Sequence, residues 1–299
     1  MDSRTSLDGI LPPITTPFDE RGDLDLEALA WNIERYNSSP LRGYVAFGSN
    51  GEAAHLSLDE QRRVLETVRR HADDDRTLVA GIHQQSTRAA AEAIRQAASA
   101  GADAALVITP YFYKGAMTGE VLKRFFLDLA EKSELPILIY SIPQNTGVHV
   151  APAVIAELAE HPRIAGLKDS SGNLGALCQV LERVDDGFDV LVGNAGILYP
   201  ALNAGARGGI LAVACAVPAF CCELFDAVRA GDHERAQTMQ RRLAPVGRAV
   251  TSDYGIAGLK TALDLLGWHG GEPRRPLLPL SETQRHSVRQ RLEDGGFLT

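Results

Sequence analysis

Apolar runs that suit buried strands alternate with amphipathic segments along most of the chain. The eight apolar runs are residues 9–18, 43–48, 77–82, 104–110, 136–141, 164–170, 189–194 and 208–214. Between them apolar residues recur at helical spacing, as in L-D-E-Q-R-R-V-L-E-T-V-R-R (58–70), where Ser57 and Glu60 have the spacing of a capping box. Nearly continuous apolar strands separated by amphipathic helices predict a parallel sheet covered by helices.

Eight such units predict an α/β protein of the (β/α)8 TIM-barrel class. The first strand contains two consecutive prolines and is the weakest of the eight. Beyond about residue 230 the strand pattern stops, and residues 231–245, 256–266 and 282–294 have helical spacing. We therefore expect a (β/α)8 barrel over residues 1–230 and a C-terminal helical extension over residues 231–299.

The composition narrows the classes of partner. A formal net charge of -8 argues against binding to nucleic acid or anionic membranes, although a small anion site can exist on an acidic protein. The longest apolar stretch, residues 208–220, is shorter than the roughly 20 residues of a membrane span, and Pro218 interrupts it. Residues 1–8 contain no apolar segment typical of a signal peptide. We expect a cytoplasmic protein with no membrane or nucleic-acid partner.

Cysteine and histidine usage indicates neither disulfides nor a metal. None of the cysteines forms a C-x-x-C pair, which suggests small core residues in a reducing compartment; they are Cys178, Cys215, Cys221 and Cys222. The eight histidines are scattered, with no H-E-x-x-H. No G-x-G-x-x-G follows the first strand and no P-loop motif occurs. We expect no metal and no cofactor.

Polar residues gather where the predicted strands end. These strand ends read G-S-N-G-E (48–52), T-P-Y-F-Y (109–113), Y-S-I-P-Q-N-T-G (140–147), K-D-S-S-G (168–172) and G-N-A-G (193–196). In a (β/α)8 barrel the active site lies at the C-terminal ends of the strands. The sequence therefore predicts an active site on this rim.

Lys168 is the candidate nucleophile on the predicted rim. It ends an apolar strand, whereas lysine is seldom buried. A structural ion pair is the alternative interpretation, but 25 of the 30 basic residues are arginines, and arginine serves such pairs better. A desolvated lysine can lose its proton and form a Schiff base, which arginine cannot.

Two further groups on the rim suit Schiff-base chemistry. Tyr140 ends the neighbouring strand, about 4.8 Å away in a parallel sheet, and a phenol there can exchange protons with a lysine adduct. The loop at residues 48–52 carries Ser49 and Asn50 between glycines, and its N–H groups can bind a carboxylate. An ordinary strand tyrosine and a tight turn are the alternatives. We expect Glu52 to support this loop rather than to contact substrate.

The motifs G-S-N-G-E, Y-S-I-P-Q-N-T-G and G-L-K-D-S-S-G, in this order, resemble the dihydrodipicolinate synthase / N-acetylneuraminate lyase family of class I aldolases. The resemblance extends over nearly the whole chain. Within the family it is most similar to the 4-hydroxy-2-oxoglutarate aldolase branch, through G-S-N-G-E and the tail at residues 253–268.

The resemblance implies roles for individual residues. Lys168 forms a Schiff base with pyruvate or a longer 2-oxo acid, and Tyr140 shuttles protons. The implied substrate-binding residues are Ser49, Asn50, Ser170, Gly193 and Ile210. It also implies a homotetramer and a lyase that releases pyruvate and an aldehyde such as glyoxylate from 4-hydroxy-2-oxoglutarate or a similar acid.

Two positions depart from the family pattern. Phe112 stands where a second relay tyrosine is usual, and we expect Tyr111 and Tyr113 to point elsewhere. Asn145 stands where the lysine-pathway synthases carry an arginine that binds the carboxylate of the aldehyde. The alternatives left open are a 2-keto-3-deoxy sugar-acid aldolase or dehydratase, a dihydrodipicolinate synthase, and a non-catalytic 2-oxo-acid sensor.

Overall fold

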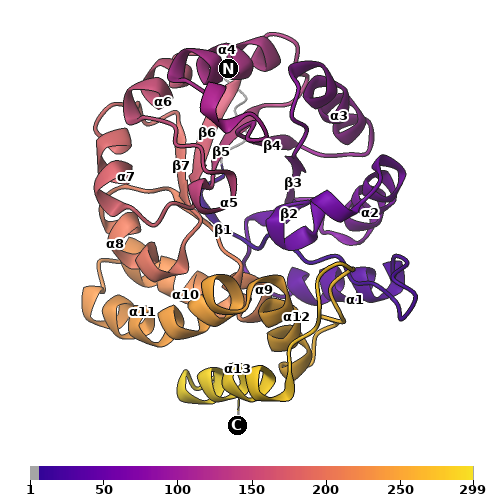
Figure 1. Ribbon diagram of the computed structural model, residues 1–299. Helices are drawn as coiled ribbons and strands as arrows, with labels where there is room; N and C mark the ends of the chain where they lie inside the picture. Colours follow the sequence, from indigo (N-terminus) through magenta and orange to yellow (C-terminus); the bar gives the residue numbers. More distant parts are fainter. Residues whose placement is uncertain (1–6, 299) are drawn as a thin grey trace.

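A computed structural model describes residues 7–298; Thr299 and residues 1–6, which belong to the stretch where we expect no signal peptide, lie outside the described residues. Its strands surround a common axis and are covered by helices (Figure 1). The strands are β1 (Gly9–Leu11), β2 (Gly43–Ala46), β3 (Thr77–Ile82), β4 (Ala104–Ile108), β5 (Ile137–Ser141), β6 (Ile164–Asp169), β7 (Asp189–Val192) and β8 (Gly208–Ile210). The predicted (β/α)8 TIM barrel is confirmed.

The strands are parallel and hydrogen-bonded in the order β1-β8-β7-β6-β5-β4-β3-β2. Between β1 and β2 a single bridge, Pro13 to Val45, brings the two ends of the sheet together. Val45 accepts a hydrogen bond from the N–H of Ile14 and donates its own N–H to the carbonyl of Pro12. Because prolines lack an N–H, this seam carries few ladder bonds and the barrel is nearly, rather than fully, closed.

Eighteen helical segments connect and extend the strands in the described residues. The shorter ones are η1 (Ser49–Gly51), η2 (Ala53–His55), η3 (Lys114–Ala116), α5 (Pro143–Thr146), η4 (Ala195–Ile197), α8 (Leu198–Asn203), α9 (Val213–Ala216) and the π-helix η5 (Ala249–Asp253). The longer ones are α1 (Leu26–Asn37), α2 (Leu58–His71), α3 (Thr87–Ser99), α4 (Gly119–Ala130), α6 (Pro152–Ala159), α7 (Leu174–Leu181), α10 (Pro218–Arg229), α11 (His233–Arg248), α12 (Gly255–Leu265) and α13 (Glu282–Asp294).

Seven of the eight strands are shorter than the sequence predicts, and the first and the last differ most. The first ends at Leu11 rather than residue 18, because Pro12 and Pro13 remove two ladder donors. The last ends at Ile210 rather than residue 214, and its apolar continuation forms α9 instead. An apolar run alone does not distinguish a buried strand from a buried helix, which explains the second difference.

The capping box at the start of α2 is confirmed. The Glu60 N–H donates to Ser57 Oγ at 3.3 Å, and the Ser57 N–H donates to Glu60 Oε2 at 2.8 Å. These bonds satisfy N–H groups that the first helical turn leaves free. The three C-terminal helices that the sequence predicts also form, as α11, α12 and α13.

The core has two layers that follow from strand alternation. Leu138 and Tyr140 on β5 belong to the apolar cluster that fills the barrel, whereas Ile137 and Ile139 pack in the larger cluster beneath the helices. Successive side chains on a strand point to opposite faces, so a residue two positions from an inward residue also points inward. Because of this alternation, the Tyr140 side chain points to the inside of the barrel, one residue before the end of β5.

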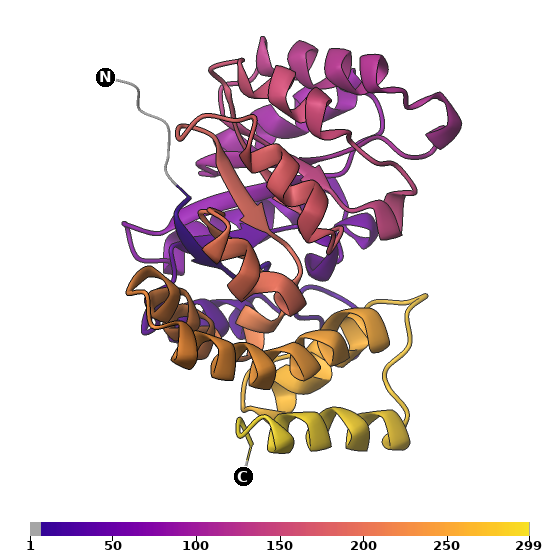
Figure 2. The same cartoon turned by 90° about the vertical axis from the view of Figure 1, so that its left-hand side faces the viewer.

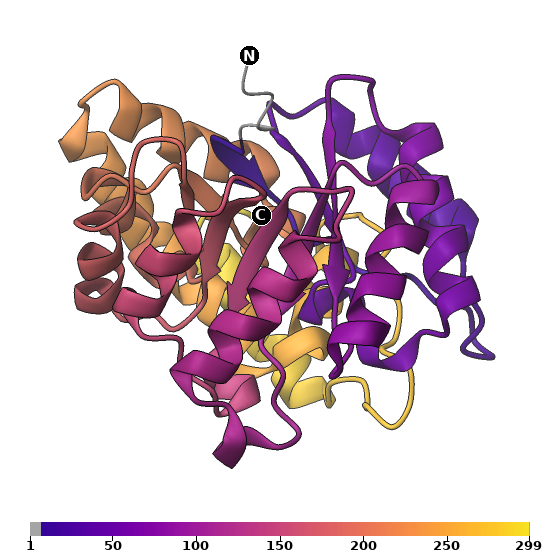
Figure 3. The same ribbon diagram turned by 90° about the horizontal axis from the view of Figure 1, so that it is seen from above.

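The C-terminal helices lie along one side of the barrel. In Figure 3 the strands lie between the indigo helices of the N-terminal part and orange helices near the C-terminus. Helix α13 packs on α11 and α12 and is the element farthest from the strands in Figure 2. We retain residue 230 as a proposed boundary between barrel and extension. None of the helices in the described part of the chain combines the length and apolar composition that a bilayer crossing requires.

Candidate active site

One cavity of about 1390 Å³ opens at the C-terminal ends of the strands. Its lining includes all seven predicted site residues: Ser49, Asn50, Tyr140, Lys168, Ser170, Gly193 and Ile210. They come from five separate strand ends and the loops that follow them. The fold thus brings these residues together as the strand-end rule predicts.

Lys168 and Tyr140 form the centre of this cavity. The strand register pairs Tyr140 on β5 directly with Lys168 on β6. Lys168 Nζ lies 4.2 Å from the centroid of the Tyr140 ring, and the two residues are 4% and 2% exposed. Among the described residues Lys168 has no carboxylate within ion-pair distance. A nearly buried amine without a carboxylate partner is suited to nucleophilic attack on a carbonyl.

Ser49 connects the glycine-flanked loop to this centre. Its Oγ lies 3.3 Å from the Tyr140 hydroxyl, and either atom can donate the hydrogen bond. Ser49 and Asn50 lie on the single-turn helix η1, which begins two residues after the end of β2. The phenol is therefore placed between the lysine amine and a hydroxyl of the loop.

Close backbone packing shapes the opposite side of the cavity. The Gly193 N–H donates to the carbonyl of Asp169 at 2.7 Å, which joins the ends of β6 and β7. A Cβ on Gly193 would lie 1.9 Å from Ser170 Oγ, so only glycine fits beside this serine. Ile210, at the end of β8, is 1% exposed and adds an apolar wall.

His83, which is not among the predicted site residues, also lines the cavity. It directly follows β3, so the strand-end rule applied to G-I-H would have found it. Its Nε2 lies 2.7 Å from the Phe47 carbonyl, and because a carbonyl only accepts, Nε2 carries the proton. Burial lowers the pKa of His83 to about 4, the Lys168 charge acts in the same direction, and the bond to Phe47 opposes both. The imidazole is neutral at pH 7.

The tyrosines after β4 differ from expectation in one respect. Tyr111, which we expected to point away from the site, lines the cavity and packs against the barrel interior. Phe112 and Tyr113 are each 73% exposed and contact each other edge to face. The N–H groups of Tyr111 and Phe112 both donate to Gln85 Oε1, which fixes the loop so that Tyr111 faces inward.

The C-terminal extension supplies one wall of the cavity. The lining residues include Arg248 at the end of α11, Thr251 and Ser252 on η5, and Tyr254 between η5 and α12. A π-helical turn inside a longer helical stretch is often found at functional sites. Residues 277–280 contribute a further, largely apolar edge.

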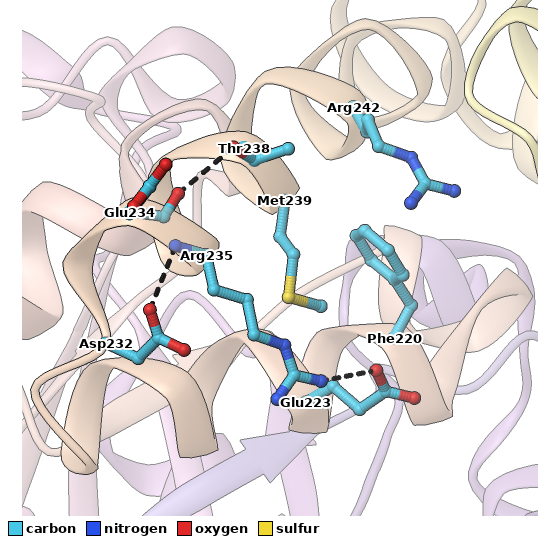
Figure 4. A pocket seen from close by; sticks show the side chains of 8 residues that line it. All are labelled: Phe220, Glu223, Asp232, Glu234, Arg235, Thr238, Met239 and Arg242. Atoms are coloured by element: carbon cyan, nitrogen blue, oxygen red, sulfur yellow. Dashed lines mark hydrogen bonds and ion pairs between the residues drawn. The ribbon is translucent and has the colours of Figure 1, made fainter.

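Another hollow, of about 530 Å³, lies over α10 and α11 (Figure 4). Both of its arginines are already engaged: Arg235 pairs with Glu223 at 3.1 Å, and Arg242 stacks over Phe220. The described residues that line this hollow include no lysine and none of the predicted site residues. We therefore assign the chemistry to the cavity around Lys168. Within residues 7–298 no group of three His, Cys, Asp or Glu side chains is placed to hold a metal ion.

Comparison with known proteins confirms the family that the motifs resemble, but the relatives are named as synthases and do not support the expected 4-hydroxy-2-oxoglutarate aldolase branch. The family model described as the dihydrodipicolinate synthetase family matches residues 6–294. A 4-hydroxy-tetrahydrodipicolinate synthase of Methanoculleus marisnigri is 37% identical over 292 residues, which cover 97% of this chain and 99% of the relative. The corresponding enzyme of an Exiguobacterium species is 34% identical over 285 residues, covering 95% and 97%.

Solved structures of dihydrodipicolinate synthases superpose closely on this chain. The dihydrodipicolinate synthase of Thermotoga maritima gives a TM-score of 0.93 at 28% identity, covering 98% of this chain and 99% of that one. The Aquifex aeolicus structure gives a TM-score of 0.91 at 28% identity, covering 97% and 98%.

Proposed function

The chain belongs to the dihydrodipicolinate synthetase family, whose members are pyruvate-dependent lyases and synthases of the class I aldolase type, and from this premise we propose a substrate and a role for each site residue. The substrate we propose is 4-hydroxy-2-oxoglutarate or a similar 4-hydroxy-2-oxo acid. Cleavage releases pyruvate and an aldehyde such as glyoxylate. The observation that carries the proposal is the buried Lys168 amine beside the Tyr140 phenol in a large cavity.

The proposed reaction begins with attack of Lys168 Nζ on the ketone carbon of the 2-oxo acid. Tyr140 protonates the resulting hydroxyl, which leaves as water and gives a protonated Schiff base. The Tyr140 phenolate then takes the C4 hydroxyl proton, the C3–C4 bond breaks, and its electron pair forms the C2–C3 double bond as the Schiff base becomes an enamine. The aldehyde departs, Tyr140 returns the proton to C3, and hydrolysis of the Schiff base releases pyruvate and the free lysine.

The remaining site residues position the substrate in this proposal. Ser49, Asn50 and the N–H groups of their loop bind the 1-carboxylate, which places the 2-oxo carbon over Lys168. Ser170, Gly193 and Ile210 line the pocket around the carbon chain. The Ser49–Tyr140 contact of 3.3 Å supports a proton path from the phenol to the loop.

The identity of the aldehyde separates two candidate functions. Asn145, on α5, lines the cavity and offers only a neutral amide, which disfavours an aldehyde whose remote carboxylate needs an arginine to bind and orient it. The names of the relatives instead favour the 4-hydroxy-tetrahydrodipicolinate synthase reaction, in which pyruvate condenses with aspartate semialdehyde. A 2-keto-3-deoxy sugar-acid aldolase, a dehydratase and a non-catalytic sensor are the other outcomes that the test must distinguish.

The test has two stages. Pyruvate with borohydride is expected to add one reduced pyruvate to the wild-type chain and none to Lys168→Ala, measured by intact mass. An adduct that persists in Lys168→Ala would overturn the Schiff-base assignment. Side-by-side kcat/KM values for 4-hydroxy-2-oxoglutarate cleavage and for condensation with aspartate semialdehyde then choose between the two functions. An adduct without turnover of any 2-oxo acid would indicate a sensor.

We further propose that the protein is a homotetramer in the cytoplasm. The exposed aromatic pair Phe112 and Tyr113 supports a subunit contact next to the cavity mouth, because large exposed apolar groups commonly mark interfaces.

A further inference from the structure

The loop that carries Ser49 and Asn50 is bracketed by two strained residues. Among the non-glycine residues that the structure describes, only Phe47 (φ 59°) and Glu52 (φ 54°) have positive φ. Side chains with a Cβ rarely adopt this conformation, and it persists only where the surrounding structure enforces it. The contacts of Glu52 therefore indicate what holds the loop in place.

The Glu52 side chain is fully buried and has three partners. Its Oε1 forms an ion pair with Lys260 Nζ at 2.8 Å, with both side chains 0% exposed, and accepts no hydrogen bond of regular geometry in the described residues. Its Oε2 accepts the Arg274 N–H at 2.9 Å and lies 3.1 Å from His55 Nδ1. Two of these partners, Lys260 and Arg274, belong to the C-terminal extension.

Lys260 reaches the same loop by a second route. Its ammonium donates to the carbonyls of Thr16 and Glu272, each at 2.9 Å. The Thr16 hydroxyl in turn donates to the carbonyl of Gly51 at 2.8 Å. Lys260 is thus joined to Glu52 directly and to Gly51 through Thr16, and helix α12 packs against η1.

Lys260 is not a second nucleophile. It does not line the cavity, and its ammonium is engaged by an ion pair with Glu52 and by hydrogen bonds to the carbonyls of Thr16 and Glu272. Nor does stability alone account for the pair, since replacing a buried ion pair by apolar side chains is often neutral or stabilising. The distinctive consequence of the ion pair is geometric. Together with Thr16, it fixes Gly51 and Glu52, the two residues immediately after Ser49 and Asn50.

We propose that the Lys260–Glu52 ion pair is a positioning device by which the C-terminal extension holds Ser49 and Asn50 in the conformation that binds the substrate carboxylate. Lys260 is a positioning residue and touches no substrate. This inference rests on the proposed function, since it assumes that the loop binds the carboxylate of a 2-oxo acid.

The test uses borohydride trapping of pyruvate at increasing pyruvate concentrations, with the unfolding temperature measured in parallel. The variants are Lys260→Met, Glu52→Gln and the double variant. Each single change leaves a buried charge without its partner and lowers the unfolding temperature, whereas the double variant removes both charges and recovers much of it. In the double variant we expect the half-saturating pyruvate concentration to stay about tenfold to a hundredfold above wild type, because the loop is no longer held.

A merely structural pair gives a different pattern. Then the half-saturating concentration of every folded variant equals that of wild type, because this concentration does not depend on the fraction of active protein. That result would overturn the proposal. The control is Leu263→Ala, a buried apolar change on the same helix, which is expected to lower the unfolding temperature without changing the half-saturating concentration.

Thr16→Val provides a test that introduces no uncompensated charge. It removes the hydroxyl that donates to Gly51 and keeps the carbonyl that Lys260 contacts. We expect a rise of about threefold or more in half-saturating pyruvate, the effect of losing one hydrogen bond that orders the loop. An unchanged value in Thr16→Val rejects the positioning role, whereas the absence of any adduct in the wild-type chain rejects the proposed function itself.

Discussion

Tyr140 and Lys168 are register partners on β5 and β6, and the lysine Nζ lies 4.2 Å from the centroid of the tyrosine ring. The Tyr140 hydroxyl also lies 3.3 Å from Ser49 Oγ. The ring therefore packs against the nucleophile while its hydroxyl points to the loop. In the proposed mechanism, packing and proton transfer belong to different parts of this side chain, and a single substitution separates them.

Tyr140→Phe is expected to lower kcat by about 10²–10⁴-fold, the usual contribution of a general acid–base group. The ring stays in place, so the fold and the apolar contact with Lys168 are retained. Steady-state kinetics measures the loss, and the unfolding temperature serves as the control. A loss below about threefold would assign proton transfer to another group.

Gly193→Ala is expected to raise KM for the 2-oxo acid by about tenfold or more, because the new Cβ would lie 1.9 Å from Ser170 Oγ and 2.9 Å from Ser170 Cβ. Ser170 and the end of β6 must move to admit it. The matched control is Gly115→Ala, where a Cβ meets nothing within 4 Å. Equal kinetics of the two variants would show that Ser170 does not shape the binding pocket.

Asn145→Arg is expected to shift the ratio of the two kcat/KM values toward aspartate semialdehyde. An arginine binds a carboxylate with paired, charge-assisted bonds about twice as strong as neutral ones. Asn145 lies on an exposed part of the cavity wall with room for the longer side chain. Asn145→Gln, which adds length without charge, is the control. A wild-type preference for aspartate semialdehyde would contradict the argument and favour the synthase.

Glu60 gives a prediction for acid stability. Its hydrogen bond with Arg274 lowers the pKa of Glu60 to about 2, and bonds from Ser57 add to the effect. A carboxyl whose pKa is lower in the folded state stabilises the fold above its unfolded pKa of about 4.5, and this contribution is lost as the pH falls toward 2. Glu60→Gln is therefore expected to lower the unfolding temperature at pH 7.

The difference between wild type and Glu60→Gln is expected to shrink between about pH 5 and pH 2, measured by thermal unfolding across that range. The control is Glu20→Gln at an exposed position, which is expected to show little difference at any pH. A difference for Glu60→Gln that is independent of pH would mean that the ion pair with Arg274 contributes nothing.

Phe112→Glu is expected to weaken the proposed tetramer. The side chain is 73% exposed in the single chain, so a charge there leaves the fold intact but opposes burial in a subunit contact. Sedimentation velocity measures the assembly state. Leu58→Glu, at another exposed apolar residue, is the control. An unchanged assembly in Phe112→Glu would place the subunit contact elsewhere.

The local pattern of the sequence determines the repeated βα units and the rim of polar strand ends. Strand alternation and the position of Lys168 at the end of an apolar run suffice to place it beside Tyr140, because parallel neighbouring strands end at the same edge. Likewise, the capping box at Ser57 depends only on residues three positions apart. Strand alternation, strand ends and helix caps each depend on a few neighbouring residues, so short segments of the sequence are enough to predict them.

Only the tertiary structure decides the contacts between distant segments. Lys260 and Thr16 are 244 positions apart, and helical spacing within α12 gives no indication that the lysine reaches a barrel loop. The same holds for η5 as a wall of the cavity and for Tyr111, which the loop anchored on Gln85 turns inward. Periodicity reports which face of an element is buried, whereas the partner on that face depends on how every intervening element packs.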